Sequence, residues 1–127
     1  MRMRSIMPIT LAVLALGTAA LSHAPAALAH TPYDGRWSVL IVTDAGTCDR
    51  AYRYALDISN GQVSYDDPSF NVSGHVDGRG HVNVSVSAAG ERATGAGQLS
   101  GDYGRGYWTG HSSASACSGH WEAERRG

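Results

Sequence analysis

Hydrophobic and polar residues alternate along most of the chain after residue 35. The alternation runs through residues 36–43, 51–58, 69–76 and 81–87, with a shorter run at 63–65. Asn60-Gly61 and the segment 77–80 separate some of these runs, and both have turn-forming sequences. A period of two with short turns between the runs is typical of an antiparallel β-meander.

The second half of the chain is rich in glycine, which is also a feature of disordered tails. It nevertheless contains Leu99, Tyr103, Tyr107, Trp108 and Trp121, and bulky groups of this kind favour a packed structure. Glycines within strands let large rings lie over bare backbone. We therefore predict three more strands, at residues 92–100, 104–112 and 117–125, and an all-β fold.

The chain has two cysteines, Cys48 and Cys117, and in an oxidising compartment a single pair in a small domain predicts a disulfide. If the last predicted strand runs antiparallel beside the first, its start meets the end of the first, and the two cysteines lie close together. The sequence thus predicts a small antiparallel meander that forms a closed or nearly closed β-barrel. A β-sandwich of the same strands is the alternative.

Residues 1–29 have the order of a secretory signal peptide. Two arginines in the first four residues precede an apolar run at 6–21, and Ala27-Leu28-Ala29 provides a cleavage site. We predict cleavage after Ala29, a single disulfide-bonded β domain at residues 30–127, and a periplasmic or secreted location.

Charge narrows the range of partners. Residues 30–127 contain eight arginines against eleven acidic residues, and the chain has no lysine. A mildly acidic domain without a basic stripe argues against nucleic acid. We expect a monomer without a membrane span in its mature form, whose partner is an unknown protein or a small-molecule ligand.

A Gly-x-Trp pattern occurs at Gly35-Arg-Trp37, Gly106-Tyr-Trp108 and Gly119-His-Trp121. The first interpretation is that the tryptophan rings fill the core. The second is an aromatic-lined pocket of the kind that small barrels use for ligands. The residues of this aromatic core or pocket are Trp37, Tyr107, Trp108 and Trp121.

The segment from Cys48 to Tyr54 offers a second candidate site. Its arginines and tyrosines are residue types that are frequent in recognition surfaces. The candidate residues are Arg50, Tyr52, Arg53 and Tyr54. The alternative, which the period of two favours, places both tyrosines in the core and both arginines in solvent.

The residues give no clear signature of catalysis or of a metal site. His75, His81 and His120 fall opposite the apolar positions, and His75 and His81 flank a turn where they could be cross-strand neighbours. His111 precedes Ser112, but no serine lies in a Gly-x-Ser-x-Gly sequence. We expect no catalytic residue, no metal and no cofactor, and therefore a protein that is not an enzyme.

Three segments, Tyr33–Val39, Gly46–Tyr54 and Ala116–Arg125, resemble a group of small exported proteins of alphaproteobacteria. Some members carry a label of haem utilisation or adhesion. The resemblance covers nearly the whole mature domain and implies an exported β-rich protein. A more distant similarity, through the Gly-x-Trp strand and the Cys48-Asp49 pair, is to small disulfide-bonded barrels that inhibit secreted metalloproteases.

These observations lead to one leading functional hypothesis, an exported non-enzymatic binding module of unknown ligand. The motivation is a braced scaffold with abundant Tyr, Trp and Arg and without a catalytic signature. The alternatives are an inhibitor of a secreted protease and a haem- or metal-binding or adhesion-related protein.

Overall fold

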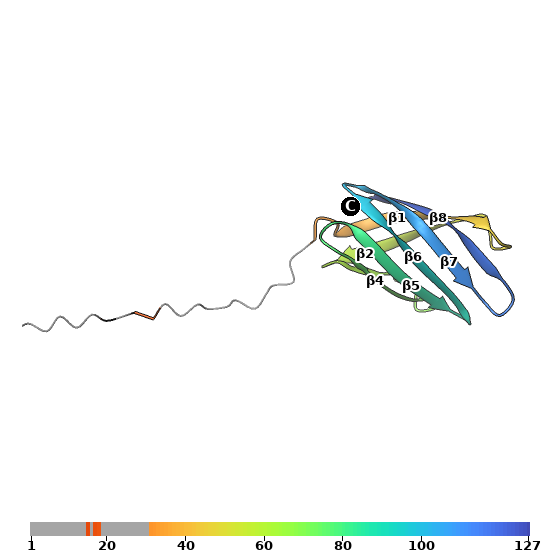
Figure 1. Cartoon of the computed structure of the whole chain (residues 1–127), viewed down its shortest axis with the longest axis horizontal. Helices are drawn as coiled ribbons and strands as arrows, with labels where there is room; N and C mark the ends of the chain where they lie inside the picture. Colours follow the sequence, from red (N-terminus) through yellow and green to blue (C-terminus); the bar gives the residue numbers. More distant parts are fainter. Residues whose placement is uncertain (1–14, 16, 19–30) are drawn as a thin grey trace, which may run out of the picture.

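Eight strands follow one another around a closed barrel, and the last strand returns to pair with the first (Figure 1). The computed structural model describes residues 15, 17, 18 and 31–127, so the predicted signal peptide lies outside the described residues except for three positions. All neighbouring strands are antiparallel. The strands are β1 (Gly35–Ala45), β2 (Ala51–Ser59), β3 (Gln62–Ser64), β4 (Asn71–Val76), β5 (His81–Ala88), β6 (Glu91–Ser100), β7 (Tyr103–His111) and β8 (Ala116–Arg125).

This architecture confirms the all-β fold and the closed barrel, and the alternative of a β-sandwich is wrong. The strands predicted in the glycine-rich half are present as β6, β7 and β8. The β2–β3 turn consists of Asn60 and Gly61, both with positive φ, as a two-residue hairpin turn requires. No helix in the part of the chain that the structure describes is long and apolar enough to cross a membrane.

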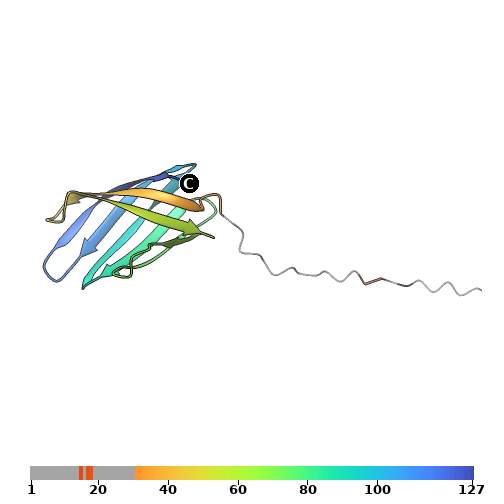
Figure 2. The same ribbon diagram turned by 180° about the vertical axis from the view of Figure 1, so that it is seen from behind.

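The two ends of the barrel are filled differently. The described chain begins and ends at the same end, where the Arg36 N–H donates a 2.8 Å hydrogen bond to the Gly127 carbonyl (Figures 1 and 2). Trp37 and Val76, the most completely buried residues, also lie here. We call this the closed end. The open end is the opposite one, where the β1–β2, β3–β4, β5–β6 and β7–β8 loops lie.

Trp37 of β1 is covered at the closed end by Arg125 of β8. The Arg125 guanidinium carbon lies 5.1 Å from the Trp37 ring centroid, within the range of a cation–π interaction. The Trp37 indole N–H donates a 2.9 Å hydrogen bond to the Tyr33 carbonyl. Both the face and the polar edge of the ring are therefore occupied.

The same guanidinium joins three parts of the chain. Arg125 donates to the Asp102 carboxylate and to backbone carbonyls at distances of 2.8–3.1 Å. The carbonyls belong to Pro32, Asp34 and Gly101. Arg125 thereby ties β8 to the β6–β7 turn and to the segment that precedes β1.

Trp121 of β8 lies inside the barrel against the bare backbone of β6 and β7. A Cβ atom at Gly106 would lie 2.6 Å from the Trp121 ring, and one at Gly97 would also collide with it. Because real Cβ contacts are never so short, both strands need glycine for the indole to lie flat against the wall. The glycine-rich sequence therefore encodes a ring-on-backbone packing that fills this part of the barrel.

The wall is weakest beside β3, which has only three residues. β2 pairs with β3 only through Asp57–Ser59, and its residues 51–56 have no ladder partner on that side among the described strands. Residues 65–70 form the connection to β4 along this part of the wall. Side chains rather than backbone hydrogen bonds must therefore close the open half of the barrel here.

Replacing Arg125 with Lys should lower the free energy of unfolding by about 2 kcal/mol, because an ammonium group cannot make the four hydrogen bonds at once. Urea unfolding followed by tryptophan fluorescence measures the change. The matched control is Arg126→Lys, whose side chain is exposed and pairs only with Glu124. Equal stability of the two variants would contradict the bracing role.

Asp77 in the β4–β5 turn accepts hydrogen bonds from the backbone amides of His81 and Arg79, and its carboxylate lies 2.9 Å from the His81 ring Nδ1. These bonds, those from His81 first, hold the pKa of Asp77 below its usual value. A carboxyl group with a lowered folded-state pKa stabilises the fold above its unfolded-state pKa, and the effect is lost as the pH falls through the folded-state pKa.

The Asp77→Asn variant should therefore have a lower Tm than the wild type at neutral pH, and the difference should shrink towards zero between about pH 4 and pH 2. Thermal unfolding followed by circular dichroism over this range measures it. Asp66→Asn, in a neighbouring turn, serves as the control. A difference that stays constant down to about pH 2 would show that the ionised carboxylate is not the cause.

Candidate functional site

The barrel encloses a cavity of about 650 Å³ that is accessible at the open end. Alternate residues of each strand point inward, so the wall is mainly aliphatic and the floor is formed by Trp37, Leu99 and Trp121. None of the polar or charged residues in the described chain is buried. The aliphatic wall residues are Val39, Ile41, Leu56, Val72, Val84 and Val86.

An aromatic cluster forms the cavity wall beside the short strand β3. Tyr54 of β2 contacts Tyr65 and Phe70 of the β3–β4 loop edge-on, with ring centroids 5.7 and 6.4 Å apart, and Tyr65 and Phe70 are 5.6 Å from each other. Tyr52 stacks on Tyr54 at 6.0 Å, nearer the rim. Together these rings close the wall where the ladder is interrupted.

The electrostatic environment of the two β2 tyrosines follows from these positions. Burial among the rings, with a smaller contribution from Tyr65, raises the pKa of Tyr54 above its usual value. A hydrogen bond to the Asp49 carboxylate is the main cause of the raised pKa of Tyr52. Both phenols are therefore neutral at physiological pH and present uncharged surfaces.

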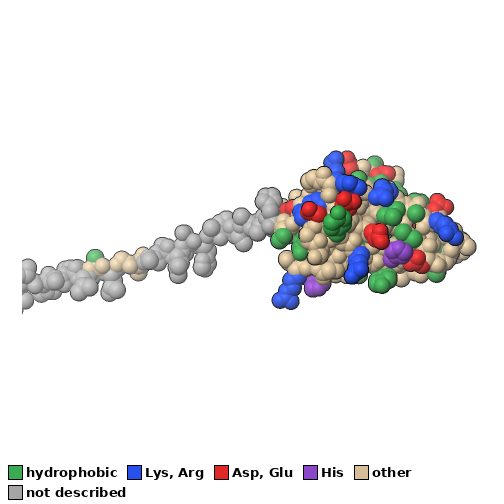
Figure 3. Space-filling model, turned by 90° about the horizontal axis from the view of Figure 1, so that it is seen from above, with side chains coloured by type: hydrophobic (Ala, Val, Ile, Leu, Met, Phe, Trp, Pro, Cys, Tyr) green, Lys and Arg blue, Asp and Glu red, His purple; other side chains and the backbone are tan. Residues whose placement is uncertain are grey.

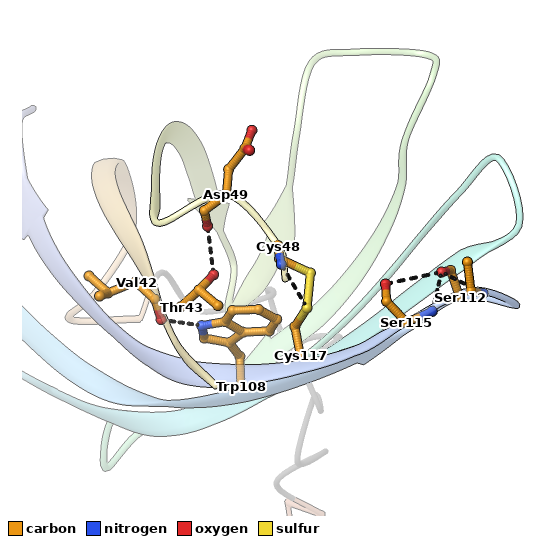
Figure 4. Close-up of a disulfide and its surroundings, with 9 residues drawn as sticks. Val42, Thr43, Cys48, Asp49, Trp108, Ser112, Ser115 and Cys117 are labelled. Carbon is orange, nitrogen blue, oxygen red and sulfur yellow. Dashed lines mark hydrogen bonds between the residues drawn. A yellow bond between two sulfur atoms is a disulfide. The ribbon is translucent and has the colours of Figure 1, made fainter. Parts of the chain in front are cut away.

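Trp108 of β7 forms the wall opposite the aromatic cluster. Its indole N–H donates a 2.9 Å hydrogen bond to the Val42 carbonyl of β1 (Figure 4). A Cβ atom at Gly119 would lie 2.9 Å from the indole nitrogen, so this ring also rests on bare backbone. Because the N–H is already used, Trp108 offers the cavity an apolar face.

The disulfide holds the β1–β2 loop at the rim. Cys48 and Cys117 are bonded, and the Cys48 N–H donates to the Cys117 sulfur at 3.1 Å (Figure 4). The Thr43 hydroxyl donates to the Asp49 carbonyl at 2.7 Å, which fixes the other side of the loop. Residues 47–49 therefore form a defined part of the cavity mouth.

Polar groups that line the cavity lie at its rim. They come from the β1–β2 loop, from the start of β6 and from the β7–β8 connection. Besides the tyrosines described above, the ionisable residues are Asp49, Glu91, Arg92 and His111, and the serines are Ser112 and Ser115. The site thus has an apolar interior and a polar edge.

The structure separates the residues of the predicted recognition surface between Cys48 and Tyr54. Tyr52 and Tyr54 line the cavity, whereas Arg53 points the other way and donates to Ser38 at 3.0 Å, and Arg50 is exposed in the β1–β2 loop. The four residues do not share one face. The two faces separate as the period of two predicts, but the tyrosines line the cavity instead of filling the core, and Tyr52 is 38% exposed.

Of the predicted aromatic set, Trp37, Trp108 and Trp121 all line the cavity. Tyr107 does not, because it alternates with Trp108 along β7 and is 77% exposed on the outer surface. Its inclusion in the pocket was therefore wrong. Acidic, arginine and hydrophobic side chains are intermixed on the outer face drawn in Figure 3.

The histidines occupy separate places. The register pairs His75 with Asn83, so His75 and His81 are not direct cross-strand neighbours. His81 contacts Asp77, and His120 lies 2.7 Å from Asp44. Within residues 31–127 no group of three or more His, Cys, Asp or Glu side chains is placed to hold a metal ion.

Sequence reasoning did not identify Tyr65 and Phe70 as cavity residues. Both lie just outside a regular strand, but both continue the alternation of the neighbouring strand: Tyr65 follows Val63 by two residues, and Phe70 precedes Val72 by two. This shared parity was the available signal, because it places both rings on the inward side.

Comparison of the chain with protein-family models, curated proteins and solved structures finds no match in any of the three.

Replacing both Cys48 and Cys117 with Ser should lower the free energy of unfolding by about 4 kcal/mol, the chain-entropy value for a loop of this length. Chemical denaturation measures the loss. Wild-type protein in excess dithiothreitol is the control and should match the double variant. A wild type that loses no stability on reduction would show that the disulfide does not brace the rim.

Proposed function

We propose that this protein is an exported, non-enzymatic binding module that holds one small apolar molecule inside its barrel. The observation that carries the proposal is the cavity of about 650 Å³, open at one end, with an apolar wall and a polar rim. Eight-stranded barrels have interiors of the size that holds a single small ligand.

The size and chemistry of the cavity support this function. Its volume falls within the range of roughly 300–1,000 Å³ that is usual for small-molecule sites. Each methylene group moved from water into such an interior contributes about 0.8 kcal/mol, so an apolar ligand gains affinity without a specific polar contact. The apolar wall favours binding over acid–base or nucleophilic chemistry.

The rigidity of the scaffold also supports it. The disulfide fixes the rim, and Arg125 braces the closed end through its contacts with Trp37 and Asp102. A cavity that is formed before binding loses less conformational entropy when the ligand enters. The disulfide thus holds the open end of the cavity, and the Arg125 contacts hold the closed end.

The disulfide is consistent with an oxidising compartment, either the periplasm or the cell exterior. Cleavage after Ala29 stays a prediction. So do the two alternative functions, an inhibitor of a secreted protease and a haem- or metal-binding or adhesion-related protein.

The test uses the neutral probe N-phenyl-1-naphthylamine, whose fluorescence rises in apolar surroundings. A side chain at Gly95 of β6 would enter the cavity, since a Cβ there lies 3.7 Å from its nearest neighbours, an ordinary contact distance. Gly95→Leu should therefore raise the Kd for the probe by at least about tenfold while the barrel stays folded.

The matched control is Ala96→Leu, which places the same side chain on the outer face of the same strand, at a position that does not line the cavity. It should bind the probe as the wild type does. Absence of saturable probe binding to the wild type, or equal binding by the two variants, would overturn the proposed function.

A further inference from the structure

A row of polar residues crosses four strands at the open end. The register pairs Asn71 of β4 with Ser87 of β5, Ser87 with Arg92 of β6, and Arg92 with His111 of β7. Partners in register are about 5 Å apart, and alternation places Ser87 and Arg92 opposite the inward Val86 and Ala93. The four side chains therefore lie side by side at the rim, on the outer side of the wall. We call these four residues the rim row.

A second hollow, of about 600 Å³, lies along the rim row. Its remaining lining comes from Ser69, the β5–β6 turn and the beginning of the β7–β8 connection. It shares Glu91, Arg92, His111 and Ser112 with the mouth of the barrel cavity. A molecule that fills the barrel can therefore reach into this polar hollow with one end.

The charges at the mouth indicate which kind of polar group fits there. Among the described residues that line the barrel cavity, Arg92 is the only arginine and His111 the only histidine. Neither side chain has a hydrogen-bond or ion-pair partner in the described part of the chain. The Arg92 guanidinium presents a fork of N–H donors, and the Asn71 amide and the Ser87 hydroxyl in the same row are further donors. Together these groups match the acceptor oxygens of a carboxylate or sulfonate.

The interior excludes the opposite orientation. No arginine or histidine lies at the floor among the described cavity residues. The indole N–H groups of Trp37 and Trp108 already donate to backbone carbonyls, so the Trp121 N–H is the uncharged donor that remains there. An anionic group placed at the floor would lose its hydration without gaining a cation. The apolar part of a ligand must therefore point inward and its anionic end towards the rim row.

We infer that the ligand is an anionic amphiphile, with its apolar body in the barrel and its acidic head group at Arg92 and His111. This inference rests on the proposed function and adds the ligand class and its orientation. Glu91 and Asp49 also border the mouth, so a cationic head group is the competing outcome that the experiment must separate.

The experiment measures displacement of N-phenyl-1-naphthylamine by two competitors with the same chain, dodecanoate and dodecyltrimethylammonium, each below its micelle concentration. We expect dodecanoate to displace the probe from the wild type at a concentration about fivefold lower, as for an exposed charge contact. High salt should reduce this preference. Arg92→Gln should abolish this preference, and His111→Gln should weaken it, each measured against the Kd of the neutral probe for the same variant.

Arg105→Gln is the control, because it removes the same charge from the middle of β7, away from the rim. It should keep the preference for dodecanoate. Equal displacement by both competitors, a preference for the ammonium, or a preference that survives Arg92→Gln would overturn the inference. If the neutral probe itself does not bind the wild type, the proposed function fails instead, so the two failures are distinguishable.

Discussion

The pairing of β1 with β8 is the constraint on which the other features depend. It joins the first and last strands over most of their length, from Trp37 opposite Arg125 to Ala45 opposite Ser118. Closure removes the exposed edges that an eight-stranded meander would otherwise have. It also brings Arg125 onto Trp37 and Cys117 near Cys48, so both braces of the barrel are consequences of the same ladder.

The cavity exists because the barrel is filled unevenly. At the closed end and along β6–β8, indole rings occupy the space that glycines leave free, as Trp121 does over Gly106. Towards the open end the inward positions of β4 and β5 hold valines such as Val72 and Val84, which are too short to meet across the interior. Packing is therefore tight at the closed end and sparse towards the open end, so the barrel contains an open cavity instead of a solid core.

The fold could be predicted from the sequence because local signals agreed with one another. Alternation placed Tyr54 and Leu56 on one face of β2, Asn60-Gly61 defined a hairpin, and the strand order implied that Cys48 and Cys117 meet. The same alternation should have separated Tyr107 from Trp108, since neighbours along a strand point to opposite faces. Whether side chains fill a barrel depends on their summed volume against its radius, which periodicity does not describe. Tyr65 has the inward parity of Val63, but because it lies outside any ladder the sequence does not show that its ring meets Tyr54.

Because β3 has only three residues, one part of the barrel wall is held together less firmly than the rest. The remainder of the wall is held by continuous ladders, whereas the panel between β2 and β4 near the rim is held by contacts among Tyr54, Tyr65 and Phe70. Loop and ring motions occur in nanoseconds to microseconds, far faster than global unfolding. Opening this panel breaks ring contacts but no ladder on the β3 side of residues 51–56, so it costs less free energy than separating two paired strands, and the disulfide and the Arg125 contacts stay intact. The local stability of the panel and the global stability of the barrel can therefore be changed by different substitutions.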